Sequence, residues 1–263
     1  MSSYRKLAMR VLGRPLHTGG GSDSSRPASQ RAAAFILTAA MFTTLTAPAF
    51  AETWHIENGD ITVKAGDTEG TNKVSQGTII DKVDTNTIIT NSDKDTPSSN
   101  TVTIDAENDK VEVTLDNVNI KAGSGSALTS KGDVTLALNG DNHLTGGISD
   151  TGNYGRNGIA SSGSLTITGG ENDSLTAQGG SGADGGHGIY SNGSVTISGG
   201  TVKAAGGDSK DGYGGDGIRS DGGVTISGNT VNAAGGSGGK VGGYGICSFD
   251  PVAISGGTVT ANG

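Results

Sequence analysis

Short stretches of alternating apolar and polar residues, separated by glycine-rich turns, fill the second half of the chain. One clear copy runs from Gly188 to Gly207 and reads GIYSNGSVTISGGTVKAAGG. The alternation predicts three short strands in this copy, at 189–191, 194–197 and 201–204. Their apolar members would all point to one side, and these are Ile189, Val195, Ile197, Val202 and Ala204.

The pattern recurs at a slowly changing interval. Copies start at Gly158, Gly188, Gly217 and Gly245, and a weaker copy starts at Ala127, so the spacing falls from 31 to 28 residues. The inward positions recur with it, as Ile159, Leu165, Ile167, Leu175 and Ala177, then Ile218, Val224, Ile226, Val231 and Ala233, then Ile246, Val252, Ile254, Val259 and Ala261. Self-similarity of this length indicates a solenoid.

Three strands per repeat without any helical pattern predict an all-β fold, a parallel β-helix with about 28–31 residues per coil including edge loops. Each coil would bury five aliphatic side chains, worth about 1.5–3 kcal/mol each. Ordering a residue costs about 1–2 kcal/mol, so one coil cannot stand alone and stacking must stabilise it. We expect the Gly-Gly corners to turn with positive φ. A β-sandwich is the competing fold, but it would not repeat its inward residues so faithfully.

The parts of the chain outside the clear repeats predict its domain organisation. Residues 52–110 hold strand candidates at 61–63, 78–80, 87–89 and 101–104, which we interpret as degenerate coils that cap the solenoid. Residues 111–263 form the repeats. Because the chain stops at Gly263, at the end of a good repeat, we expect a longer native protein with further domains.

The first 51 residues are typical of a secretory signal peptide. A basic segment precedes the apolar run AAAFILTAAMFTTLTA at 32–47, and Ala49-Phe50-Ala51 forms an A-x-A cleavage site. The run of about sixteen residues is shorter than the roughly 20 that a membrane span needs. A retained anchor is the alternative, but we expect a secreted or cell-surface protein with no membrane insertion after cleavage.

Charge and cysteine content narrow the function. The first 51 residues hold six of the 18 basic and one of the 26 acidic residues, so the rest has 12 bases, 25 acids and a net charge near −13. This charge argues against binding nucleic acid. Cys247 is the only cysteine, so no internal disulfide can form.

Insertions at 148–157, 181–187, 208–216 and 237–244 follow the third strand of successive coils and should line one edge of the solenoid. They carry carboxylates among glycine carbonyls, a chemistry that suits calcium. The candidate ligands are Asp150, Asp184, Asp208, Asp211 and Asp216. The alternative is that these residues only make turns.

Tyrosines recur near the same edge. Tyr154, Tyr213 and Tyr244 lie in the insertions, and Tyr190 lies on the outward side of a strand. Exposed rings in a row can stack on the faces of sugars, so we expect these four to bind carbohydrate. The loop tyrosines could instead pack on their own glycine turns.

Enzymatic function has little support in the residues. Gly186-His187-Gly188 is similar to the G-H-G motif of polygalacturonases, but the Asp-Asp pair and the Arg-Ile-Lys motif of those enzymes are missing. Glycoside hydrolysis needs two carboxylates around one bond, and no such pair is evident. We expect no catalytic residues, with a pectin-type lyase or hydrolase as the least favoured alternative.

The segment VEVTLDNVNIKAGSGSALTSKGDVTLALNGDNHLTGG at 111–147 resembles the carbohydrate-binding β-helix domains on surface proteins of clostridia and related gut bacteria. The opening WHIENGDI at 54–61 is also similar to such proteins. The resemblance implies a single-stranded, right-handed parallel β-helix, calcium sites and non-catalytic binding of plant-type polysaccharide. We therefore expect a bacterial glycan-binding module or adhesin whose partners are polysaccharides or host glycans, with a structural spacer as the alternative.

Overall fold

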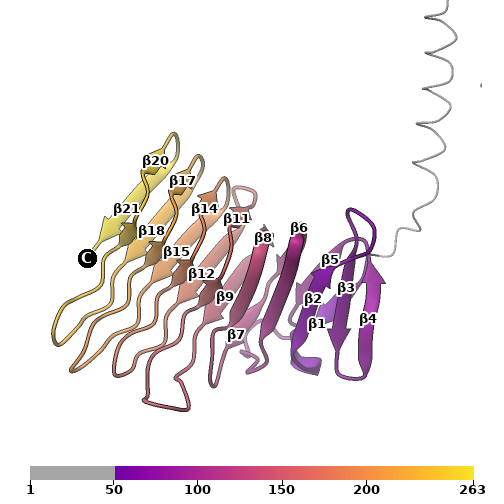
Figure 1. Cartoon of the computed structure of the whole chain (residues 1–263), viewed down its shortest axis with the longest axis horizontal. Coiled ribbons are helices and arrows are strands. Elements are labelled where there is room, and N and C mark those ends of the chain that lie inside the picture. The colour runs from indigo at the N-terminus through magenta and orange to yellow at the C-terminus, as the bar shows by residue number, and fades with distance from the viewer. Residues whose placement is uncertain (1–50) are drawn as a thin grey trace, which may run out of the picture. The chain divides into compact units, whose positions relative to one another are not determined.

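The computed structural model describes residues 51–263. These residues form a β-solenoid of about six turns, with coils of about 29 residues stacked in parallel (Figure 1). The prediction of a parallel β-helix is confirmed. The basic and apolar segments of the predicted signal peptide lie outside the described residues. Within 51–263, no helix has the length and apolar character needed to cross a membrane.

Each regular coil contributes three strands, and equivalent strands of successive coils pair in parallel. The first face holds β10 (Ile159–Ser161), β13 (Ile189–Ser191), β16 (Ile218–Ser220) and β19 (Ile246–Ser248). The second holds β11 (Leu165–Thr168), β14 (Val195–Ile197), β17 (Val224–Ile226) and β20 (Val252–Ile254). The third holds β7 (Asn119–Lys121), β9 (Asp141–Thr145), β12 (Ser174–Gln178), β15 (Thr201–Ala205), β18 (Thr230–Ala234) and β21 (Thr258–Asn262). The long strand β8 (Leu128–Asn139) pairs with both β10 and β11, so it joins the first two faces.

The strand register follows the repeat intervals read from the sequence. Ile159 pairs with Leu128 on one side and with Ile189 on the other, and Ile189 pairs in turn with Ile218. The inward residues of the coils at 158, 188 and 217 are all buried, so like side chains stack on one another along the interior. In the last coil the register continues, but Val252 and Ile254 are 45% and 54% exposed because no described coil covers them.

The expectation of positive φ at the Gly-Gly corners holds at Gly199-Gly200 and Gly256-Gly257 but is wrong at others, including Gly169-Gly170. At the turn between the second and third strands, Gly200 does have a φ of 74°. At the corner after the third strand, Gly179 and Gly180 do not have positive φ. A Cβ on Gly180 would lie 2.1 Å from the carbonyl oxygen of Gly147 in the preceding coil. Glycine is needed there for close backbone approach rather than for its φ.

Corner glycines and glycines near the ends of the last three insertions form a layer of backbone along the loop side. Each of these loops has one glycine of the layer at its start and one near its end. Backbone hydrogen bonds link the start and end glycines of successive coils alternately in one chain. We call it the glycine layer; it contains Gly180, Gly186, Gly207, Gly215, Gly236 and Gly243. Each N–H from Gly186 onward donates to the carbonyl of the preceding member, at 2.8–2.9 Å.

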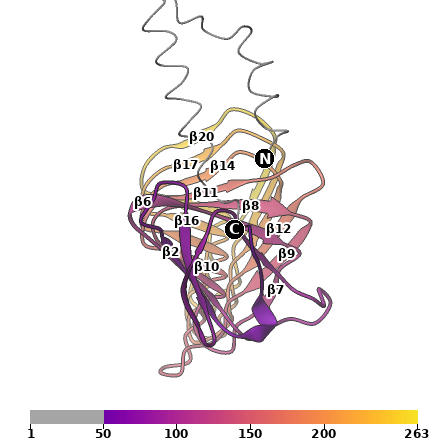
Figure 2. The same cartoon turned by 90° about the vertical axis from the view of Figure 1, so that its right-hand side faces the viewer.

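The N-terminal part combines degenerate coils with an inserted hairpin. Its elements are β1 (Thr53–His55), the 3-10 helix η1 (Ile56–Asn58), β2 (Ile61–Ala65), β3 (Asn72–Gln76), β4 (Ile79–Asp84), β5 (Thr87–Thr90) and β6 (Val102–Asp116). The parallel stack continues from β6 to β2 and β5, and from β5 to β1. Strands β3 and β4 pair antiparallel. The strand expected at 78–80 overlaps β4, whereas β3 was not expected. The boundary drawn at residue 110 falls inside β6. Figure 2 looks along the stack from the side of this cap.

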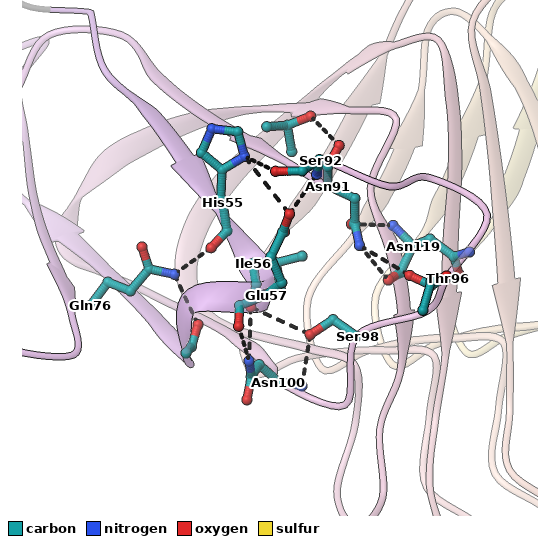
Figure 3. Close-up of polar contacts among 12 residues, drawn as sticks. His55, Ile56, Glu57, Gln76, Asn91, Ser92, Thr96, Ser98, Asn100 and Asn119 are labelled. Carbon is teal, nitrogen blue, oxygen red and sulfur yellow. Dashed lines mark hydrogen bonds and ion pairs between the residues drawn. The ribbon is translucent and has the colours of Figure 1, made fainter.

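Polar side chains satisfy the backbone where η1 interrupts the strands (Figure 3). The Asn100 amide donates to the carbonyl of the buried Ile56 at 2.9 Å, and the Gln76 amide donates to the carbonyl of His55 at 2.7 Å. The backbone N–H of Ser92 donates to the Glu57 carboxylate at 2.6 Å. These bonds replace the strand ladder at a point where the backbone cannot form it.

Candidate functional site

The four insertions stack on one another as a continuous side of the solenoid, as their common position in the repeat predicted. The N–H of Gly155 donates to the carbonyl of Asp184, and the N–H of Gly185 donates to the carbonyl of Tyr213, both at 2.8 Å. Gly214 repeats the bond with Val241 at 2.9 Å. The loops are therefore held in register with the strands that follow them.

This register arranges the outward side chains in three rows parallel to the solenoid axis, each row three residues further along the chain. We call them together the array. The outer row is Tyr154, Asp184, Tyr213 and Val241; the middle row is Asn157, His187, Asp216 and Tyr244; the strand row is Ala160, Tyr190, Arg219 and Cys247. Successive members of a row belong to successive coils, so they lie about 4.8 Å apart along the axis.

The middle row is tied together by bonds from side chain to backbone. The Asn157 amide oxygen accepts from the N–H of His187, and His187 Nδ1 accepts from the N–H of Asp216, both at 2.8 Å. The Asp216 carboxylate then accepts from the N–H of Tyr244 at 2.7 Å. Each side chain thus supports the equivalent residue of the next coil, and His187 must keep Nδ1 unprotonated to do so.

Ring and charge contacts fill the space between the middle and strand rows. The rings of His187 and Tyr190 are 5.7 Å apart, and the Tyr190 hydroxyl donates to the Asp221 carboxylate at 3.1 Å. Arg219 pairs with Asp216 at 3.3 Å and lies 5.4 Å from the centre of the Phe249 ring. These contacts fix the rotamers of the side chains that form the floor of the site.

Burial shifts the pKa of two groups in the array. It lowers the pKa of the His187 imidazole below its ordinary value; the Asp216 carboxylate opposes this shift and the Arg219 charge adds to it. Burial, with the hydrogen bond to Asp221, raises the pKa of the Tyr190 phenol. At neutral pH both groups are uncharged, so they present hydrogen-bonding and ring surfaces rather than charge.

The array encloses two adjoining hollows of about 420 Å³ each. The first hollow is lined by Tyr154, Asn157 and Tyr190, and the second by Tyr213, Asp216 and Tyr244. Both are also lined by Asp184, His187 and Arg219. Together they form a groove that runs along the axis over four coils. We call it the loop-side groove.

All four predicted carbohydrate-binding tyrosines line this groove, but they do not form one row. Tyr154 and Tyr213 share the outer row with Asp184 between them, whereas Tyr244 and Tyr190 belong to the other two rows. Tyr154, Tyr213 and Tyr244 are 50%, 53% and 61% exposed. Tyr154 also packs on its own turn, because a Cβ on Gly152 would lie 2.5 Å from its ring. The Lys240 ammonium lies over the Tyr213 ring, 5.2 Å from its centre, so these tyrosines combine partial exposure with local contacts.

The five predicted calcium ligands are spread over successive loops. Asp184, Asp208 and Asp216 each accept a backbone N–H of the next coil, from Tyr213, Ser237 and Tyr244 at 2.7–2.8 Å. Asp150 borders a separate hollow with Ser124, Thr129 and Arg156. Among residues 51–263, no three His, Cys, Asp or Glu side chains gather as a metal site. This finding includes Asp211. Calcium binding by these five residues stays a prediction.

Sequence reasoning missed Asn157, which lines the groove. It also missed Asp221 and Phe249, which contact the lining residues Tyr190 and Arg219. Asn157 stands immediately before a Gly-Ile pair, as do His187, Asp216 and Tyr244. Aligning the loops from their C-terminal ends would have shown this row, since the loops differ in length only before it. Asp221 and Phe249 lie in turns after the first strand and carry no pattern that links them to the loops.

Comparisons with known protein families, with curated proteins and with solved structures found no match for this chain. The likeness to clostridial carbohydrate-binding β-helix domains therefore stays a resemblance.

Proposed function

We propose that this protein is an exported, non-catalytic module that binds polysaccharide in the loop-side groove. The observation that carries the proposal is the shape and lining of that groove, which is long, open and parallel to the axis. Half-exposed tyrosines flank it, and His187, Asn157 and Arg219 lie on its floor. A linear ligand can contact several coils at once, which suits a polymer better than a compact small molecule.

Aromatic rings and fixed polar groups are the chemistry by which proteins hold sugars. A ring buries the apolar face of a sugar, while its hydroxyl and nearby amides bond the sugar hydroxyls. In the groove, Tyr154 and Tyr213 are two coils apart along the axis, so they can contact separate units of one polymer. Calcium, if bound through the loop carboxylates, would add to this interaction, and a chelator would weaken it.

Affinity electrophoresis against cellulose, pectin and mucin tests the proposal. The double change Tyr154→Ala and Tyr213→Ala should lower affinity at least about tenfold, because a tenfold loss needs only about 1.4 kcal/mol and two ring contacts disappear. Folding stability should stay within about 0.5 kcal/mol of the native value, because both rings are half exposed. Thermal unfolding of the purified double variant checks the second expectation.

Ile80→Ala is the matched control, since Ile80 is an exposed apolar residue of the cap, 70% exposed and outside the array. It should bind as the native protein does. Absence of binding to all three polymers, or unchanged binding by the double variant, would contradict the proposal. The spacer alternative predicts that second outcome. The enzyme alternative predicts product release from pectin that His187→Ala or Arg219→Ala abolishes.

A further inference from the structure

A buried carboxylate at the end of β4 has an unusual set of partners. Asp84 is fully buried, and its Oδ2 accepts from the indole N–H of Trp54 at 2.9 Å. Its Oδ1 accepts from the backbone N–H groups of Glu52 at 3.2 Å and Asn86 at 3.1 Å. All of these donors are neutral groups.

No ion pair of residues 51–263 brings a positive charge to this carboxylate. The nearby Lys82 pairs with the side chain of Glu52 instead. Buried charges in proteins are normally paired, because an ion removed from water without a counter-ion is costly. The described residues thus offer Asp84 neutral hydrogen-bond donors and no counter-ion.

Glu52 is held firmly at the start of the fold. Its N–H contacts Asp84, its carbonyl accepts from the N–H of Ile88 at 3.1 Å, and its carboxylate pairs with Lys82. The preceding residue, Ala51, is exposed. Ala51 is also the last residue of the A-x-A pattern, so the predicted cleavage point and the start of the anchored chain coincide at the same peptide bond.

We propose that hydrolysis of the Ala51–Glu52 peptide bond by a signal-processing protease gives the buried Asp84 a counter-ion, because the new α-ammonium group of Glu52 pairs with its carboxylate. Water provides the hydroxyl that completes the Ala51 carboxyl group and a hydrogen for the Glu52 nitrogen. At neutral pH the carboxyl group loses a proton and the amine gains one. The nitrogen already lies 3.2 Å from Asp84 Oδ1, so the pair forms without movement of the backbone.

Processing would therefore stabilise the cap, and the gain would depend on pH. The charges that face the new amine are Asp84, the carboxylate of Glu52 and Lys82. The pair exists only while the amine is protonated, and an ordinary α-amine titrates near pH 8. A partner carboxylate favours the charged form, so the gain is complete at neutral pH and is lost as the pH rises above that range. The inference rests on the export that the proposed function includes, but not on glycan binding.

The test starts from the full chain, exported by a bacterial host with its own N-terminal segment. Intact mass should show a product that begins at Glu52. Thermal unfolding between pH 6 and pH 10 is then compared for this product and for the unprocessed chain purified from the cytoplasm. We expect the processed protein to unfold about 4 °C or more higher at pH 7. The difference should vanish by about pH 10.

Two variants and one chemical probe make the result specific. Asp84→Asn should remove the pH-dependent difference, whereas Lys82→Met should keep it, because the Lys82 ammonium pairs with the Glu52 side chain and forms no ion pair with Asp84 among residues 51–263. In the native product the α-amine should react with an acetylating reagent at least about tenfold more slowly than in the denatured product. This probe needs no substitution, so it decides even if Asp84→Asn does not fold. A different N-terminal residue, a difference that does not depend on pH, or an unprotected amine would overturn the proposal.

Discussion

The strand faces and the loop side of each coil pack by different means. On the strand faces, side chains such as Ile197 and Ile226 pair in register and are fully buried. On the loop side, the backbone of one coil contacts the backbone of the next, and a Cβ on Gly215 would lie 1.9 Å from the carbonyl oxygen of Gly186. The strand faces gain stability from buried side-chain volume, whereas the loop side requires residues without a side chain.

This difference predicts how each region responds to substitution. The stack of Val134, Leu165, Val195 and Val224 already contains two different side chains at one position, so the interior accepts small changes of shape. The glycine layer accepts none, because any Cβ meets a carbonyl oxygen that is already hydrogen-bonded. Three substitutions, taken from the largest expected effect to the smallest, would break or sharpen this contrast.

The first is Gly215→Ala in the glycine layer. The new methyl group would overlap backbone on the preceding coil, so the coils at 188 and 217 must separate locally. We expect a loss of about 4 kcal/mol or more in the free energy of unfolding, measured by urea denaturation. Gly242→Ala is the control, since its Cβ would meet only one atom, at 3.5 Å, and its φ is not positive. Equal losses in the two variants would disprove the role of the layer.

The second is Ile226→Ala on the second face. Truncation leaves a cavity between two coils, and we expect a loss of about 2–5 kcal/mol by the same measurement. Ile254 occupies the equivalent place in the last coil and is 54% exposed, so Ile254→Ala should cost under about 1 kcal/mol. If both changes cost the same, burial by stacking is not what stabilises this position.

The third concerns His187, whose Nδ1 accepts the N–H of Asp216 on the loop side and whose ring lies 5.7 Å from that of Tyr190 in β13. The fold lowers the pKa of His187 and so favours the neutral ring. Stability from this residue is therefore complete above the ordinary histidine pKa of about 6.5 and is lost as the pH falls below it. Thermal unfolding from pH 7.5 to pH 4.5 should show this loss in the native protein.

His187→Asn should remove that component, because an amide oxygen can accept the Asp216 N–H as Asn157 accepts that of His187, without titrating. The effect should be smaller than that of either packing variant, since one hydrogen bond is at stake. A pH profile that the His187 variant retains would show that other groups cause the loss.

The same contrast explains how much the sequence could predict. The strands, their register and the interior followed from aliphatic residues that recur in phase, because each side chain must match the one above it. The hairpin of β3 and β4 escaped notice since it has no second copy. The strand row follows from the repeat, since Ala160, Tyr190, Arg219 and Cys247 align in the sequence. The outer and middle rows escaped, because loops of unequal length hide their alignment unless it is read back from the Gly-Ile pair.

The roles of the glycines and carboxylates were harder to predict, because one residue type serves several purposes here. Glycine turns the chain at Gly200 but permits close contact at Gly180, and only the position of the neighbouring coil tells the two apart. Asp184 and Asp216 were expected as calcium ligands, and the structure shows that both also bond backbone of the next coil. The sequence of a single coil does not show which residues of the adjacent coils these glycines and aspartates contact.

The stacked register also has a mechanical consequence. Hydrogen bonds between coils run along the solenoid axis, so tension applied to its two ends would load them in series rather than all together. The least supported coil should then detach first, and each later event should release one coil of 28 to 31 residues, or about 100 Å of extended chain. A force–extension curve of the protein should therefore show successive unfolding steps of nearly equal length.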